Sequence, residues 1–103
     1  MKLYVKNYII GELKDFEEIK ETLNNADKSI INSKVLLQLN KNYNAMEKVI
    51  NSLNPEEKRF YELYFREKYD RTAVCCKMYF ELSTFYRIRN KIIYKLANEL
   101  GLS

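Results

Sequence analysis

The chain of 103 residues is 47% hydrophobic and 31% charged, which fits one compact domain with an appendage or one all-helical domain. Its apolar runs are too short to span a bilayer and its first ten residues do not form a signal peptide, so we expect no membrane contact and a cytoplasmic location. The lack of histidine, the two adjacent cysteines and the two glycines leave no zinc or iron–sulfur site and no phosphate-binding loop, so we expect no metal, no cofactor and no enzymatic activity.

The net charge of +4 is unevenly distributed along the chain. Residues 1–53 carry eight basic and seven acidic side chains, whereas residues 54–103 carry ten and seven. The excess of positive charge therefore lies in the second half, where it favours an anionic partner.

The near absence of glycine and proline, with no stretch that alternates at period two, predicts an all-α fold. From Lys2 to about Leu23, apolar residues recur at helical spacing and predict one long helix of about five or six turns. The apolar stripe of this helix comprises Val5, Ile9, Leu13, Phe16, Ile19 and Leu23. Such a stripe needs a cover, either from the next helix of the same chain or from a second copy, and we favour a homodimer through this helix.

A polar connection is expected around residues 28–33, followed by a second helix that runs to Leu53 and makes a helical hairpin with the first. Its predicted inward positions are Val35, Leu36, Leu39, Tyr43, Met46, Val49, Ile50 and Leu53. Residues 40–44 are poor helix formers, so an interruption is expected there. In this interpretation, residues 1–50 form an N-terminal helical region that packs within the chain or dimerises.

The single proline marks the next boundary. Asn54 is a good N-cap, Pro55 suits the first helical position, and the two carboxylates that follow favour a helix N-terminus. The sequence therefore predicts a helix from Pro55 to about Lys68.

Residues 70–100 predict a helix-turn-helix. Asp70 is a suitable N-cap for a short first helix, in which Cys75 offers the small side chain that a close crossing of two helices needs. Phe80 is expected to plug the turn together with Val74, because both are apolar among polar or charged neighbours.

The second helix of this pair is expected to begin near Leu82, with Glu81 or Ser83 as its cap. Its apolar stripe comprises Phe85, Ile88, Ile92, Leu96 and Leu100. Between Glu81 and Glu99 there is no acidic residue, but there are four basic ones: Arg87, Arg89, Lys91 and Lys95. Arg89 falls near the apolar stripe, so its stem should pack while its head reaches water or a carboxylate. A helix with such unopposed charge favours an anionic partner, and double-stranded DNA is the obvious one.

Only about the first two or three turns of such a helix can reach base edges. The candidates for base contacts are Ser83, Thr84, Arg87 and Asn90. The candidates for phosphate contacts are Arg71, Lys77, Tyr86, Lys91, Tyr94 and Lys95. The alternative for Arg87 and Lys91 is an ordinary solvated helix face.

The order and spacing of these features resemble region 4 of sigma factors and, more closely, the small phage transcriptional regulators of the RinA and ArpU type. The resemblance extends over residues 53–102. The matching residues are Leu53, Pro55, Glu56, Glu57, Ser83, Thr84, Tyr86, Arg87, Arg89, Leu96, Ala97, Leu100 and Gly101. It implies that residues 51–103 are a DNA-binding domain of a phage or prophage late-gene activator that acts at promoter DNA with RNA polymerase.

Two alternatives remain beside the activator hypothesis. A small terminase subunit for DNA packaging also joins a helix-turn-helix to helical oligomerisation elements, and would form large rings. A helical module could instead bind RNA polymerase without reading DNA, and would then show no salt-dependent DNA binding.

Overall fold

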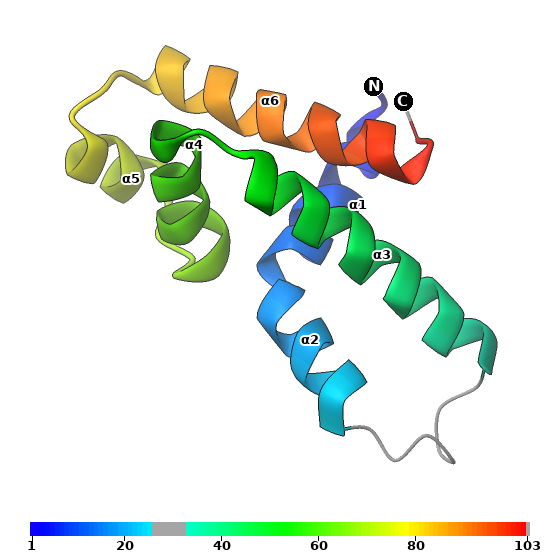
Figure 1. Ribbon diagram of the computed structural model, residues 1–103. Helices are drawn as coiled ribbons and strands as arrows, with labels where there is room; N and C mark the ends of the chain where they lie inside the picture. Colours follow the sequence, from blue (N-terminus) through cyan, green and yellow to red (C-terminus); the bar gives the residue numbers. More distant parts are fainter. Residues whose placement is uncertain (26–32, 103) are drawn as a thin grey trace.

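The computed structural model describes residues 1–25 and 33–102 of the chain, and the described part contains helices and no strand. The all-α prediction is confirmed (Figure 1). In chain order the elements are α1 (Leu3–Lys14), α2 (Phe16–Asn25), α3 (Ser33–Ser52), α4 (Pro55–Phe60), the π-helical segment η1 (Tyr61–Arg66), α5 (Arg71–Met78) and α6 (Leu82–Leu100). The predicted polar connection around residues 28–33 lies almost wholly outside the described residues.

The N-terminal helix divides at Asp15, so the prediction of one continuous helix to Leu23 is wrong. Asp15 has φ −95° and ψ 5°, outside ordinary helix geometry, although its N–H still donates to the carbonyl of Gly11 at 3.0 Å. The break lets the two halves take different neighbours, since α1 packs on α6 and η1 whereas α2 packs on α3. Periodicity alone could not predict it, because the apolar spacing continues through the break.

The apolar stripe of α1 and α2 is covered within one chain. Ile9 is completely buried and Leu13 is nearly so, and Phe16 stacks on Tyr43 of α3 with ring centroids 5.3 Å apart. The intramolecular alternative therefore describes this structure, and the uncovered stripe that favoured a homodimer is absent from the described residues.

Helix α3 runs from Ser33 to Ser52 without the predicted interruption at residues 40–44. Asn42 lies within that segment and is only 2% exposed. Its amide donates to the Tyr8 hydroxyl at 2.7 Å and to Glu12 Oε2 at 3.2 Å, so the buried polar group is satisfied by α1. A contact between distant helices thus compensates for poor local propensity. Val35, which was predicted to face inward, is instead 52% exposed.

Helix α4 begins where the proline predicts. The Asn54 side chain accepts a hydrogen bond from the Glu57 N–H at 2.8 Å, and the Glu57 carboxylate accepts one from the Asn54 N–H at 3.0 Å, which completes a capping box. The expected ordinary helix to about Lys68 is only partly right, because the chain widens into η1, where the Glu67 N–H donates to the Glu62 carbonyl. The wider turn brings three η1 side chains into the core, namely Tyr61, Leu63 and Phe65.

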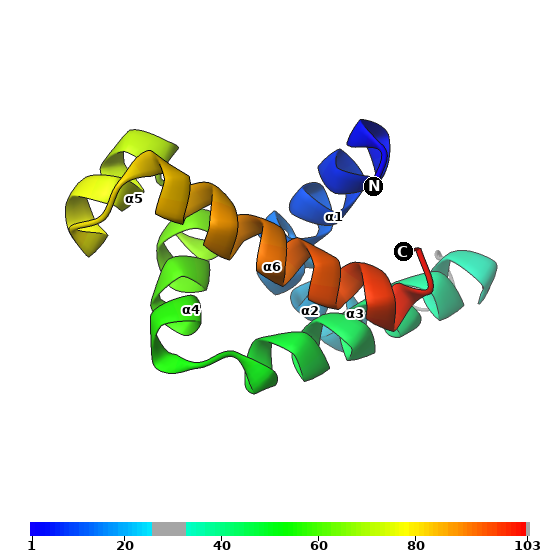
Figure 2. The same cartoon turned by 90° about the horizontal axis from the view of Figure 1, so that it is seen from above.

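Helix α6 is the element around which the others are arranged (Figures 1 and 2). It packs against α3 and α1 as well as against α4 and α5, and its predicted apolar stripe is buried throughout. The buried residues form one cluster that includes side chains from both the first 50 and the last 53 residues. Within residues 1–25 and 33–102, no helix is long and apolar enough to cross a membrane.

Candidate nucleic-acid interface

Helices α5 and α6 are joined by a three-residue turn, residues 79–81. Asp70 caps α5 as predicted, because its carboxylate accepts a hydrogen bond from the Ala73 N–H at 2.8 Å. The chain reverses at Tyr79, which adopts the left-handed conformation with φ 57° and ψ 45°. Of the two predicted caps of α6, the structure has Glu81, although its side chain makes no capping hydrogen bond.

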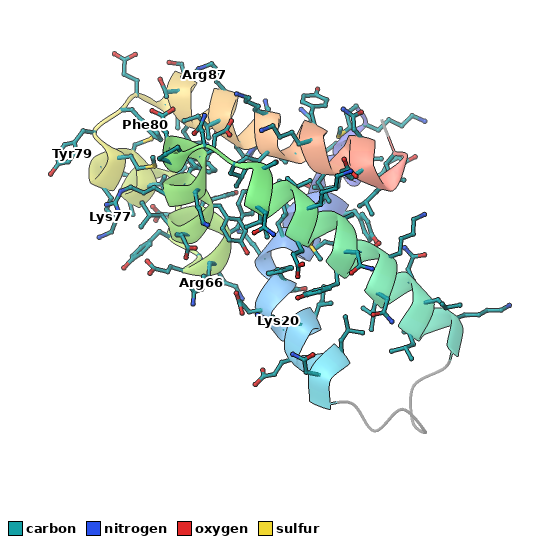
Figure 3. The ribbon with its side chains drawn as sticks, viewed as in Figure 1. Lys20, Arg66, Lys77, Tyr79, Phe80 and Arg87 are labelled. Carbon is teal, nitrogen blue, oxygen red and sulfur yellow. The ribbon has the colours of Figure 1, made fainter. Side chains whose placement is uncertain are left out.

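The turn is only partly plugged by the predicted pair. Val74 is completely buried, whereas Phe80 and Cys75 are half-buried at the edge of the core. Tyr79 is 95% exposed and, like Phe80, lies at the end of the molecule where α5 meets α6 (Figure 3). A compact two-helix unit therefore exists here, but its turn is more open than the sequence suggested.

The candidates for base contacts lie on the first three turns of α6. Ser83 and Arg87 are exposed, whereas Thr84 and Asn90 are half-buried. Arg87 makes no ion pair or hydrogen bond with any described residue, and it lies on the side of α6 away from α4 (Figure 3). Its guanidinium is thus free to meet a ligand.

Two candidates for phosphate contacts are held by tyrosines. Arg71 donates from Nη1 to the Tyr86 hydroxyl at 2.6 Å, which links the start of α5 to α6. The ammonium of Lys77 lies 4.7 Å from the centre of the Tyr69 ring. Neither contact brings a carboxylate to the cation.

Arg89 was not among the predicted DNA contacts, and the structure brings it into the same group. Its guanidinium lies 5.0 Å from the centre of the Tyr86 ring, and its Nη2 donates to Asn90 Oδ1 at 3.3 Å. Of the two partners expected for its head, water or a carboxylate, no carboxylate pairs with it among the described residues. The spacing of three residues between Tyr86 and Arg89 is the sequence signal that could have revealed this pair.

Lys91 and Lys95 have a different environment. Their ammonium groups lie 2.9 and 3.4 Å from the carboxylate of Glu57, whose side chain is only 4% exposed. Burial acts to raise the pKa of Glu57, but the hydrogen bonds from Lys91 and from the Asn54 N–H, with the charge of Lys95, outweigh it and lower this pKa. The prediction that the four charges of α6 are unopposed is therefore wrong for these two lysines, because α4 supplies a carboxylate across the core. A role for them in phosphate binding stays a prediction.

Tyr94 lies apart from the other candidates. It is two helical turns beyond Tyr86, about 12 Å along the axis, and its ring faces Lys6 of α1 at 5.9 Å. The structure does not bring it together with Arg71 or Lys77.

The charges of the described residues thus sort by their partners. Lys48, Arg66, Lys91 and Lys95 pair with carboxylates. By contrast, no described carboxylate pairs with the four cations of α5 and the first half of α6: Arg71, Lys77, Arg87 and Arg89. The α5–turn–α6 end therefore carries four cations without an ion pair beside two carboxylates, Asp70 and Glu81, which leaves it a net positive charge. Other described cations, such as Lys58 and Arg59, also form no ion pair.

Comparison with known proteins identifies the family of this chain and one relative. The profile of a family described as "Protein of unknown function (DUF722)" matches residues 6–98. The chain belongs to the DUF722 family. This DUF722 member is also similar to a protein named "Transcriptional activator rinA" from Staphylococcus phage phi11, with 39% identity over 57 residues. The match covers 55% of this chain and 41% of the phage protein, so the chain spans about two fifths of that relative. No solved structure matches the chain significantly.

Proposed function

We propose that this protein is a sequence-specific DNA-binding regulator of phage or prophage transcription, in which α5 and α6 act as a helix-turn-helix. The similarity to a phage transcriptional activator supports the biological setting. The observation that carries the DNA-binding part is the set of four cations at the α5–turn–α6 end that no described carboxylate neutralises. A surface of this kind attracts the DNA backbone.

In the proposed complex the first turns of α6 lie in the major groove. Arg87 is exposed and unpaired, so its planar guanidinium suits the two acceptors of a guanine edge, while Ser83 and Thr84 lie one turn nearer the start of the helix. Arg71 and Lys77 of α5 contact phosphates and set the orientation. Asn90 already accepts a hydrogen bond from Arg89, which makes it a weaker candidate for base contact.

Residues 51–103 are the proposed DNA-binding part, and residues 1–50 support α6 from the other side. As an activator of late genes the protein would act together with RNA polymerase at a promoter. The name of the phage relative supports transcriptional activation, and the resemblance to regulators of the RinA and ArpU type implies the late genes and the polymerase. Its sigma region 4-like character belongs to the same proposal.

The test is footprinting of the full chain on the genome that encodes it. We expect one or a few protected sites of promoter character, bound more tightly than random duplexes of equal length. Transcription from such a site with purified polymerase should rise when the protein is added. Protection confined to a packaging site, or affinity equal for all duplexes, would contradict the proposal.

A further inference from the structure

We propose that Arg71, Tyr86 and Arg89 together form a preorganised binding site for one phosphodiester group of the DNA backbone. The inference rests on the proposed DNA-binding function and names a contact within it. Tyr86 is the centre of the site, because its hydroxyl holds one guanidinium at 2.6 Å and its ring lies under another at 5.0 Å.

The first argument is charge. Two guanidinium groups meet at one tyrosine, and neither forms an ion pair with any carboxylate in residues 1–25 or 33–102. Arg66 shows the contrasting arrangement, since its guanidinium pairs with Glu62 at 2.8 Å. Arg59 and Arg87 are also without an ion pair among the described residues, so what distinguishes the cluster is that two unpaired guanidinium groups meet at one side chain.

The second argument is burial. Arg89 is half-buried, and its Nε is buried without a hydrogen-bond partner among the described residues. A cation withdrawn from water without a counter-charge costs free energy. An anion at the outer nitrogens of this guanidinium would lower that cost, and so the site favours an anionic ligand.

The third argument is the set of hydrogen-bond donors. The Tyr86 hydroxyl accepts from Arg71, so its own proton is free to be donated to an anionic oxygen. Arg71 keeps further N–H groups in its planar fork, a geometry that matches two oxygens of one phosphate. Because both guanidinium groups are already held in place, little side-chain freedom remains to be lost on binding.

The position of the site fits the backbone at the edge of the groove. Tyr86 and Arg87 are adjacent on α6 and project about 100° apart, so a helix that places Arg87 over the bases turns Tyr86 toward one strand. The Cα of Arg89 lies about 160° around the helix from that of Arg87, beside the apolar stripe, and it is the Arg89 guanidinium over the Tyr86 ring that reaches this flank. On that same flank lies Arg71, at the start of α5. Lys91, which lies on the other side of Arg87 around the helix, is ion-paired to Glu57, a carboxylate that it shares with Lys95. We therefore assign the main backbone contact of α6 to the Tyr86 flank.

The test is fluorescence anisotropy of the full chain with the footprinted duplex and a random duplex, over a series of salt concentrations. Arg71→Gln should weaken binding to both duplexes and reduce the slope of log affinity against log salt by about 0.9, because one phosphate contact is lost. Tyr86→Phe keeps both charges and the ring, so it should weaken binding several-fold with an unchanged slope. Arg71→Gln/Tyr86→Phe should weaken binding by less than the sum of the two single effects, since the two side chains hold each other and one phosphate.

Arg66→Gln is the matched control, because Arg66 is exposed, paired with carboxylates and distant from the turn in Figure 3. It should bind like the unaltered protein. Arg71→Lys is a second variant. It should keep the slope, because lysine keeps the charge, and should lower the affinity, because lysine lacks the planar guanidinium fork. If the unaltered chain binds DNA but Arg71→Gln and Tyr86→Phe bind equally well, or if their effects add, this inference is overturned and the proposed function stands. If the unaltered chain binds no duplex, the proposed function itself fails.

Discussion

Arg87 and Lys91 lie one turn apart on α6, yet their side chains have different surroundings. Arg87 is free, whereas Lys91 is ion-paired to a buried carboxylate. We expect Arg87→Ala to lower affinity for the specific site by about 1–3 kcal/mol and to relax preference at one base pair. Lys91→Ala should chiefly lower the melting temperature, because Glu57 keeps only Lys95. Anisotropy titrations and thermal denaturation of both variants check this, and identical behaviour of the two would show that these roles are misassigned.

Tyr79 holds a left-handed backbone conformation that its side chain does little to stabilise, although its own N–H and that of Phe80 donate to the Cys75 carbonyl. It is a bulky residue at φ 57° and is 95% exposed, so its side chain contributes little packing. Tyr79→Gly should raise the free energy of unfolding by about 0.5–1 kcal/mol, as the relief of left-handed strain exceeds the added freedom of the unfolded chain. Tyr79→Ala is the control, since alanine keeps the Cβ atom that causes the strain. Urea denaturation should show a higher free energy of unfolding for Tyr79→Gly but not for Tyr79→Ala. An equal increase in Tyr79→Ala would argue against backbone strain.

At the scale of elements, Glu57 connects the start of α4 to the middle of α6. It completes the capping box with Asn54 and pairs with Lys91 and Lys95. Its folded-state pKa lies below the ordinary 4.5, so its contribution is present above pH 4.5 and is lost as the pH falls through the lower folded value. Urea denaturation should therefore show stability falling with pH in this window, and a much flatter profile for Glu57→Gln.

At neutral pH, Glu57→Gln should also cost about 1–3 kcal/mol, because a buried acceptor loses its charge-assisted bonds. Glu56→Gln provides the comparison, as Glu56 is exposed and forms no ion pair with the described residues. An equally steep pH profile in Glu57→Gln would remove Glu57 as the cause.

The elements that the sequence predicted well are those whose signals are local. The start of α4 at Pro55, the Asp70 cap and the buried stripe of α6 depend on residues within a few positions of one another. The break at Asp15, the continuity of α3 through Asn42 and the π-helical segment depend on contacts between distant elements, which periodicity does not carry. In the candidate site, too, the features with local signals were predicted and those that depend on distant contacts were not.

Within the site, the exposure of Ser83 and Arg87 followed from helix phase. The ion pair between Lys91 and Glu57 could not be predicted from helix phase, because the two residues are 34 positions apart and meet only after α4 packs on α6. The Arg71–Tyr86 bond likewise needs the turn between α5 and α6 to close.

For the whole molecule, α6 is shared between the two predicted regions. One end meets α5, while other contacts are with α1 and α3, so residues 1–50 and 51–103 contribute to one buried cluster. Because the stripe of α1 and α2 is already covered, we expect the full chain to be a monomer at high micromolar concentration. Sedimentation equilibrium checks this, and a dimer that dissociates when the chain is shortened to begin at Lys34 would restore the homodimer hypothesis. In a monomer the same shortening should expose Met46 and Val49 and cause aggregation.

The most direct test of DNA binding by the α5–turn–α6 end is the salt dependence of affinity of the full chain for the footprinted duplex. One phosphate held by Arg71 and Arg89 and a second held by Lys77 predict a slope of log affinity against log salt of about −1.8, with tighter binding than to a random duplex at every salt concentration. The absence of binding at low salt, or binding with a slope near zero, would contradict the account.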